Sequence, residues 1–115
     1  MSKTINVSNL YEVQQWFKSY GFTNLDIQQE GLVELSQGTY ELTDNMIAVW
    51  TNHPNIGCGF ICEVFPEENV VVLTCIYDNT VYGYMHLIRN TIELENYVNR
   101  CIRNYSLVFE QPVST

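Results

Sequence analysis

Two apolar runs joined by a two-residue connection constrain the fold of this chain more than any other feature. Val70–Tyr77 is dense in β-branched residues, Asp78-Asn79 follows it, and Val81–Ile88 returns with further apolar and aromatic residues. Asp and Asn tolerate the positive φ that two-residue hairpin turns require, so the pattern predicts an antiparallel hairpin. Other elements must then cover at least one face of this hairpin to form a core.

The register of this hairpin predicts two unlike faces. With Asp78-Asn79 as the loop, Cys75 lies opposite Tyr82 and Leu73 lies opposite Tyr84. One face is apolar, and we expect a helix to cover it. Its residues are Val70, Val72, Thr74, Ile76, Val81, Gly83, Met85 and Leu87. The other face is aromatic with polar tips, a composition typical of a protein interface. Its residues are Val71, Leu73, Cys75, Tyr77, Tyr82, Tyr84 and His86. If both helices cover the first face, the second stays open. The alternatives are a helix on each face, a loop over the second face, or a homodimer through it.

Shorter runs earlier in the chain predict further strands. They alternate between apolar and polar residues or are densely apolar, and residues that favour turns separate them. These runs are Leu25–Gln29, Leu32–Ser36, Thr39–Leu42, Met46–Thr51 and Gly57–Phe65. We therefore expect an antiparallel sheet of about five strands, built from hairpins and a meander.

A helix is expected on each side of this strand-rich region. Asn9 followed by Glu12 is a capping pattern, and apolar residues at helical spacing predict a helix over Asn9–Tyr20. Asn90 and Glu93 repeat the pattern before an apolar stripe that continues to Tyr105. The sequence thus predicts one α+β domain over residues 1–115, with its C-terminal helix packed on the sheet.

The charge distribution is strongly uneven. The 115 residues carry a formal net charge of −8, and Ser19–Ile88 contains nine carboxylates but no Lys or Arg. Phosphate binding needs clustered basic residues, so a nucleic-acid ligand is disfavoured, and an anionic membrane surface is disfavoured for the same reason. A basic protein partner is favoured, because complementary fields raise the rate of encounter.

The polar opening of the chain does not resemble a signal peptide, and no segment approaches the ~20 apolar residues of a membrane span. We therefore expect a cytoplasmic protein, in a bacterium or a phage-infected host cell, whose four cysteines are buried thiols. His53, Cys58 and Cys62 have the types of zinc ligands. However, the two cysteines lie ~13 Å apart along one strand unless it bends at Gly59. We expect no metal and no cofactor.

Catalytic signatures are weak. Cys75 or Cys62 could be a nucleophile beside His86 or His53, but an apolar or acidic neighbourhood raises the pKa of a thiol. Glu67, Glu68 and Asp78 fall in predicted turns, where carboxylates are usually solvated. No phosphate-binding loop, nucleophile elbow or EF-hand spacing occurs, so we do not expect an enzyme.

These observations favour a small acidic binding protein that inhibits or neutralises a basic partner. An immunity protein against a nuclease toxin, or a phage-type inhibitor of a nucleic-acid-binding defence enzyme, would fit. The candidate partner-binding residues are Trp50, Tyr77, Tyr82, Tyr84, His86, Asp44, Glu63, Glu67, Glu68 and Asp78. One alternative is a ligand-binding or enzymatic domain with a pocket around Trp50, His53 and His86. Another is a homo-oligomerisation module.

Overall fold

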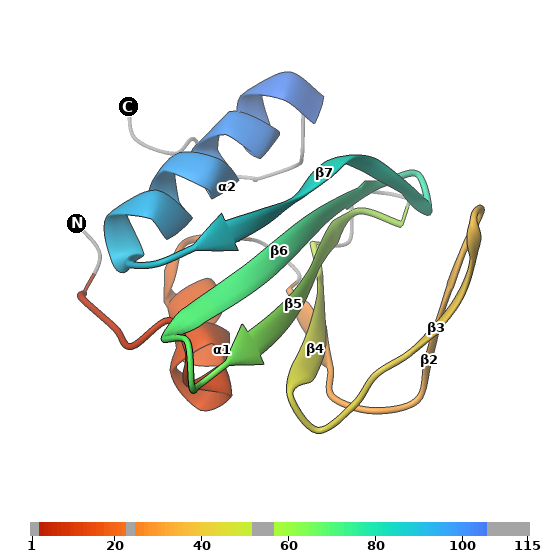
Figure 1. The fold of residues 1–115 in the computed structure, drawn as a ribbon. Coiled ribbons are helices and arrows are strands. Elements are labelled where there is room, and N and C mark those ends of the chain that lie inside the picture. The colour runs from red at the N-terminus through yellow and green to blue at the C-terminus, as the bar shows by residue number, and fades with distance from the viewer. Residues whose placement is uncertain (1–2, 23–24, 52–56, 106–115) are drawn as a thin grey trace.

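The chain folds into a five-stranded antiparallel sheet with both helices on one face and a separate β-hairpin on the other (Figure 1). This computed structural model describes residues 3–22, 25–51 and 57–105. The helices are α1 (Leu10–Ser19) and α2 (Thr91–Tyr105). The strands are β1 (Asp26–Gln28), β2 (Leu32–Leu35), β3 (Gly38–Glu41), β4 (Met46–Trp50), β5 (Gly59–Phe65), β6 (Val70–Tyr77) and β7 (Thr80–Ile88). The predicted α+β fold, with its N-terminal helix, antiparallel sheet and packed C-terminal helix, is confirmed.

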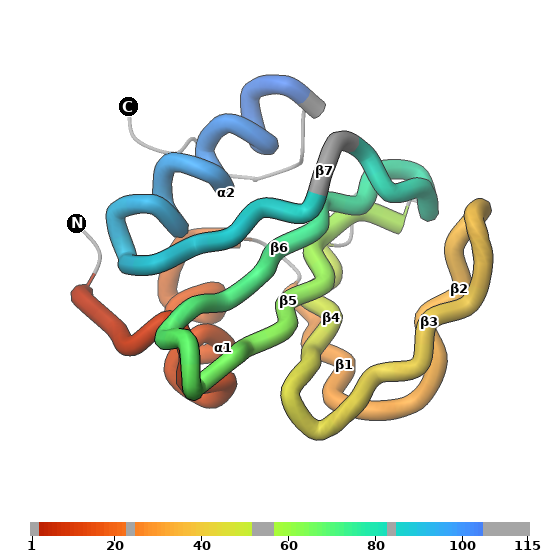
Figure 2. Tube along the Cα trace, in the orientation of Figure 1, coloured from red at the N-terminus to blue at the C-terminus, as the bar shows by residue number. Residues whose placement is uncertain are grey.

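Strands β2 and β3 are not part of the five-stranded sheet. The sheet has the order β1-β4-β5-β6-β7, while β2 and β3 pair only with each other. Figure 2 shows this hairpin standing apart from the sheet, beyond β4. It is anchored by Val33 and Leu42, which are buried against Ala48, Ile61 and Ile76 of the sheet. The sequence placed these two runs in one continuous meander, and the structure corrects that interpretation.

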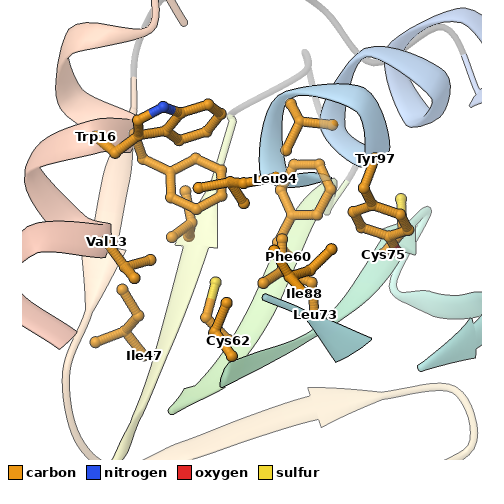
Figure 3. Close-up of a cluster of buried hydrophobic side chains, with 14 of the residues drawn as sticks. Val13, Trp16, Ile47, Phe60, Cys62, Leu73, Cys75, Ile88, Leu94 and Tyr97 are labelled. Carbon is orange, nitrogen blue, oxygen red and sulfur yellow. The ribbon is translucent and has the colours of Figure 1, made fainter. Parts of the chain in front are cut away.

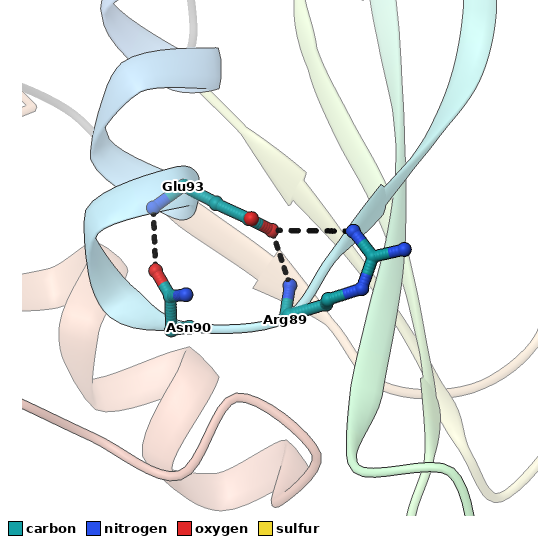
Figure 4. Close-up of polar contacts among 3 residues, drawn as sticks. All are labelled: Arg89, Asn90 and Glu93. Atoms are coloured by element: carbon teal, nitrogen blue, oxygen red, sulfur yellow. Dashed lines mark hydrogen bonds and ion pairs between the residues drawn. The ribbon is translucent and has the colours of Figure 1, made fainter.

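Both helices begin at the predicted caps. The Asn9 side chain accepts a hydrogen bond of 3.0 Å from the backbone N–H of Glu12, and Asn90 does the same for Glu93 at 2.9 Å. The Glu93 carboxylate in turn accepts from the backbone N–H of Arg89 (Figure 4). These bonds satisfy N–H groups that have no partner inside a helix, and each cap stabilises its helix by about 1 kcal/mol.

The main core lies between the helices and the sheet (Figure 3). Phe60 of β5 is at its centre, with ring centroids 5.5 Å from Phe17 of α1 and 6.1 Å from Tyr97 of α2. Because it contacts both α1 and α2, this single ring joins both helices to the sheet. Burying one such side chain stabilises the fold by roughly 1.5–3 kcal/mol.

The core face of the β6–β7 hairpin is the one that the sequence predicted to be open, and the predicted core face is partly exposed. Val71, Leu73 and Cys75 are fully buried in the core beneath the helices, whereas Met85 and Leu87 are exposed on the other side. The neighbouring strand explains this difference. On the helix side β5 presents Phe60, Cys62 and Val64, but on the opposite side it presents Gly59, Ile61 and Glu63. A carboxylate in that row makes it the poorer core face.

The hairpin register is confirmed only near the turn. Asp78 and Asn79 have φ of 55° and 58°, as a two-residue turn of this type requires. Cys75 pairs with Tyr82 as predicted, but a bulge follows and Leu73 pairs with His86 instead of Tyr84. The bulge adds two residues to β7. Because side chains alternate between the two faces of a strand, residues of β7 beyond the bulge stay on the faces predicted for them.

No helix in the described ranges is long and apolar enough to cross a membrane.

Candidate functional site

The predicted aromatic residues lie on the helix side of the sheet and are partly covered. The rings of Tyr77 and Tyr82 meet edge to face at 6.2 Å, and the His86 ring lies 4.5 Å from that of Tyr97 on α2. Partial burial, and then the charge of Arg100, lower the pKa of His86. The Tyr84 side chain lies outside the part of the chain that the structure describes. The His86 side chain is half-buried and Tyr82 is 40% exposed, so the helices cover only part of the face that the sequence predicted to be open.

Trp50 lies on the opposite side of the sheet. Its indole N–H donates a hydrogen bond of 3.2 Å to the Gln28 side chain, and its ring packs on the cluster that includes Val33. The sheet thus separates Trp50 from His86, and His53 lies outside the described residues. Trp50 and His86 share no pocket in the part of the chain that the structure describes.

Four of the five predicted acidic residues gather at one end of the sheet. Glu63 pairs across strands with Met46, and the adjoining Val64 N–H donates to the carbonyl of Asn45. This places Asp44 in the turn before β4, close to the β5–β6 turn that carries Glu67 and Glu68. Asp78 lies at the other end, in the β6–β7 turn.

A groove runs between the β2–β3 hairpin and the part of this sheet face that the hairpin leaves uncovered. We call it the hairpin groove; its volume is about 390 Å³. Its lining residues are Tyr40, Met46, Ile61, Glu63, Val72, Thr74, Val81 and Met85. Six of these eight side chains are hydrophobic or aromatic. Small-molecule and peptide sites commonly combine apolar walls of this kind with a few polar groups.

The tip of the hairpin is hydrogen-bonded to the β6–β7 hairpin beside this groove. The Ser36 N–H donates to the Asn79 carbonyl at 2.7 Å. The Gln37 amide both accepts from the Val81 N–H at 3.1 Å and donates to the Val81 carbonyl at 3.2 Å. Val81 is in the edge strand, so Gln37 also satisfies backbone groups that β7 would otherwise offer to another strand.

Glu63 is the charged residue of the hairpin groove. Its side chain is half-buried, and within the described ranges it makes no hydrogen bond or ion pair. No Lys or Arg occurs anywhere between Ser19 and Ile88, so the strands provide no neutralising charge. A carboxylate on an apolar wall attracts a cation more strongly than one in open water does.

The cysteines behave as core residues. All four are free thiols and all are buried. The neighbouring Cys101 thiol and burial raise the pKa of Cys75, and burial alone raises that of Cys62, so neither is disposed to form a thiolate. Among the described residues no cluster of three metal-ligating side chains occurs; His53 of the suggested zinc set lies outside them.

A comparison of the chain with protein-family models, curated proteins and solved structures found no match. The candidate surface therefore rests on geometry and charge alone. Sequence reasoning missed Tyr40 and Met46 and assigned Met85 and Leu87 to the core. The signal that could have corrected it was Glu63, which lies in the same row of side chains as Val72 and Leu87.

Proposed function

We propose that this protein binds a basic protein partner through the sheet face opposite the helices, where the β2–β3 hairpin leaves it uncovered. The observation that carries the proposal is the combination of exposed apolar side chains and the unneutralised Glu63 carboxylate on that face. The site differs from the aromatic face expected from the sequence, whereas the kind of partner is the same.

The apolar component argues for a contact surface. Met85 is 72% exposed and Leu87 is 49% exposed, and both point away from the helices on the same strand. Tyr40 is 41% exposed at the opposite wall of the hairpin groove. Grouped apolar side chains of this size on a surface commonly mark a site of protein interaction.

The charge component argues for a basic partner. Lys18 lies on α1 and Arg100 and Arg103 lie on α2, all in the helical layer. Arg89 follows β7, and its guanidinium lies 4.0 Å from the Glu93 carboxylate. The strands carry only acidic charges, so the two sides of the molecule differ in potential. Such asymmetry orients an approaching basic protein before contact.

A nucleic-acid-binding enzyme is the partner class that fits best, because its phosphate-binding groove is lined by Lys and Arg. Occupying that groove would inhibit the enzyme, as an immunity protein or a phage-type inhibitor does. The same apolar face could instead be a dimer seam, and the experiment below separates the two.

The proposal predicts that replacing Met85 by Ser releases the captured partner. The matched control is Ile92→Ser on α2, where an equally bulky side chain is 70% exposed in the helical layer. Partners would be captured from lysate at ~0.05 M and ~0.5 M salt and identified by mass spectrometry.

We expect a basic protein that is lost at high salt and bound about tenfold more weakly by Met85→Ser, with Ile92→Ser unaffected. Capture of acidic proteins, or equal loss in both variants, would contradict the proposal. A dimer that Met85→Ser dissociates would favour the dimer seam instead.

A further inference from the structure

We infer that the hairpin groove receives a single Lys or Arg side chain of the partner, with Glu63 as its counter-ion. This inference rests on the proposed function and makes it more specific. It names the part of the partner that enters the groove and the residue that selects it.

The walls of the groove suit the stem of such a side chain. Lys and Arg bury their methylene groups along apolar surface while the charged end reaches a polar partner. Ile61 is almost fully buried, Val72 is half-buried, and Met85 stands exposed at the mouth. Unbranched Met side chains adapt to a flexible stem, and the groove has two of them, Met46 and Met85.

The charged end of the side chain has two groups to meet. The Glu63 carboxylate lies in the groove wall and has no cationic partner among the described residues. Tyr40 forms the facing wall from the hairpin, and its ring can stack on a cation. A neutral apolar side chain would fill the same walls but leave the carboxylate partly desolvated and unpaired, which disfavours it.

The size of the groove supports one side chain rather than a larger element. About 390 Å³ is at the low end of the volumes of ligand pockets, and Gln37 fixes the hairpin tip to Val81, one of the lining residues. A helix, about 10 Å across, would have to displace the hairpin and break these bonds.

The test uses amino-acid amides as substitutes for the partner's side chain. N-acetyl-arginine amide and N-acetyl-lysine amide would be titrated into the full chain to ~50 mM, because one side chain is expected to bind in the millimolar range. N-acetyl-norleucine amide, with a matching four-carbon stem and no charge, is the control ligand. Backbone amide NMR signals report the site.

We expect the cationic amides to shift the signals of Glu63, Val72, Thr74 and Met85, and the norleucine amide to shift them far less. Glu63→Gln keeps the shape of the side chain and should weaken binding about fivefold, since it removes a charge-assisted pair. The unliganded spectrum of this variant reports whether the fold is intact.

Three results would overturn the inference. These are no shifts in the groove at ~50 mM, equal shifts with the norleucine amide, or unchanged affinity in Glu63→Gln. Each leaves the proposed function to its own test, because a basic protein could still bind the outer face through Met85 and Leu87. Conversely, binding of the amides without any captured basic protein would support the groove chemistry and contradict the proposed function.

Discussion

At the scale of single residues, Gly59 sets how closely β4 and β5 approach. A Cβ at this position would lie 1.8 Å from the carbonyl oxygen of Val49, which is a backbone atom and cannot rotate away. We expect Gly59→Ala to lower the free energy of unfolding by more than ~3 kcal/mol, because the two strands must separate. Glu63→Ala on the same strand should change it by less than about 1 kcal/mol. Urea unfolding of both variants checks this, and comparable stabilities would contradict it.

At the scale of elements, the position of the β2–β3 hairpin depends on a few anchors. Gln37→Ala removes both amide bonds to Val81, each of which contributes about 0.5–1.5 kcal/mol. We expect amide exchange in β3 to accelerate about tenfold while global stability falls little. Gln37→Glu keeps the acceptor and loses the donor, so its exchange rate should be intermediate. Unchanged exchange in both variants would mean that the buried Val33 and Leu42 hold the hairpin without its tip.

Elements that depend on local signals could be predicted from the sequence. Caps at Asn9 and Asn90 and the turn at Asp78-Asn79 are local signals, so the helices and the main hairpin were predicted close to their observed bounds. Local signals could not predict that β2 and β3 lie outside the sheet, because their position depends on the surface against which Val33 and Leu42 are buried. Periodicity could not rank the faces of β6 either, since this strand is apolar on both sides. For that reason the sequence assigned the exposed Met85 and Leu87 to the core face.

At the scale of the whole molecule, the basic residues are confined to one side, although the helices also carry carboxylates such as Glu12 and Glu95. The basic residues lie in the helical layer and its flanks, while the sheet and hairpin carry nine carboxylates without a Lys or Arg. Net charge alone would attract a basic protein to any surface of the molecule. The proposed function instead requires that attraction act on one side, where the apolar contacts are available.

The most direct measurement compares two charge reversals with the captured basic partner. Glu63→Lys lies in the hairpin groove and Glu95→Lys lies on α2, and both change the net charge equally. We expect Glu63→Lys to raise the dissociation constant at least tenfold at low salt, and Glu95→Lys to change it less than about threefold. Equal losses in the two variants would show that only bulk charge matters, and a loss confined to Glu95→Lys would place the binding site on the helices; either result would contradict the account.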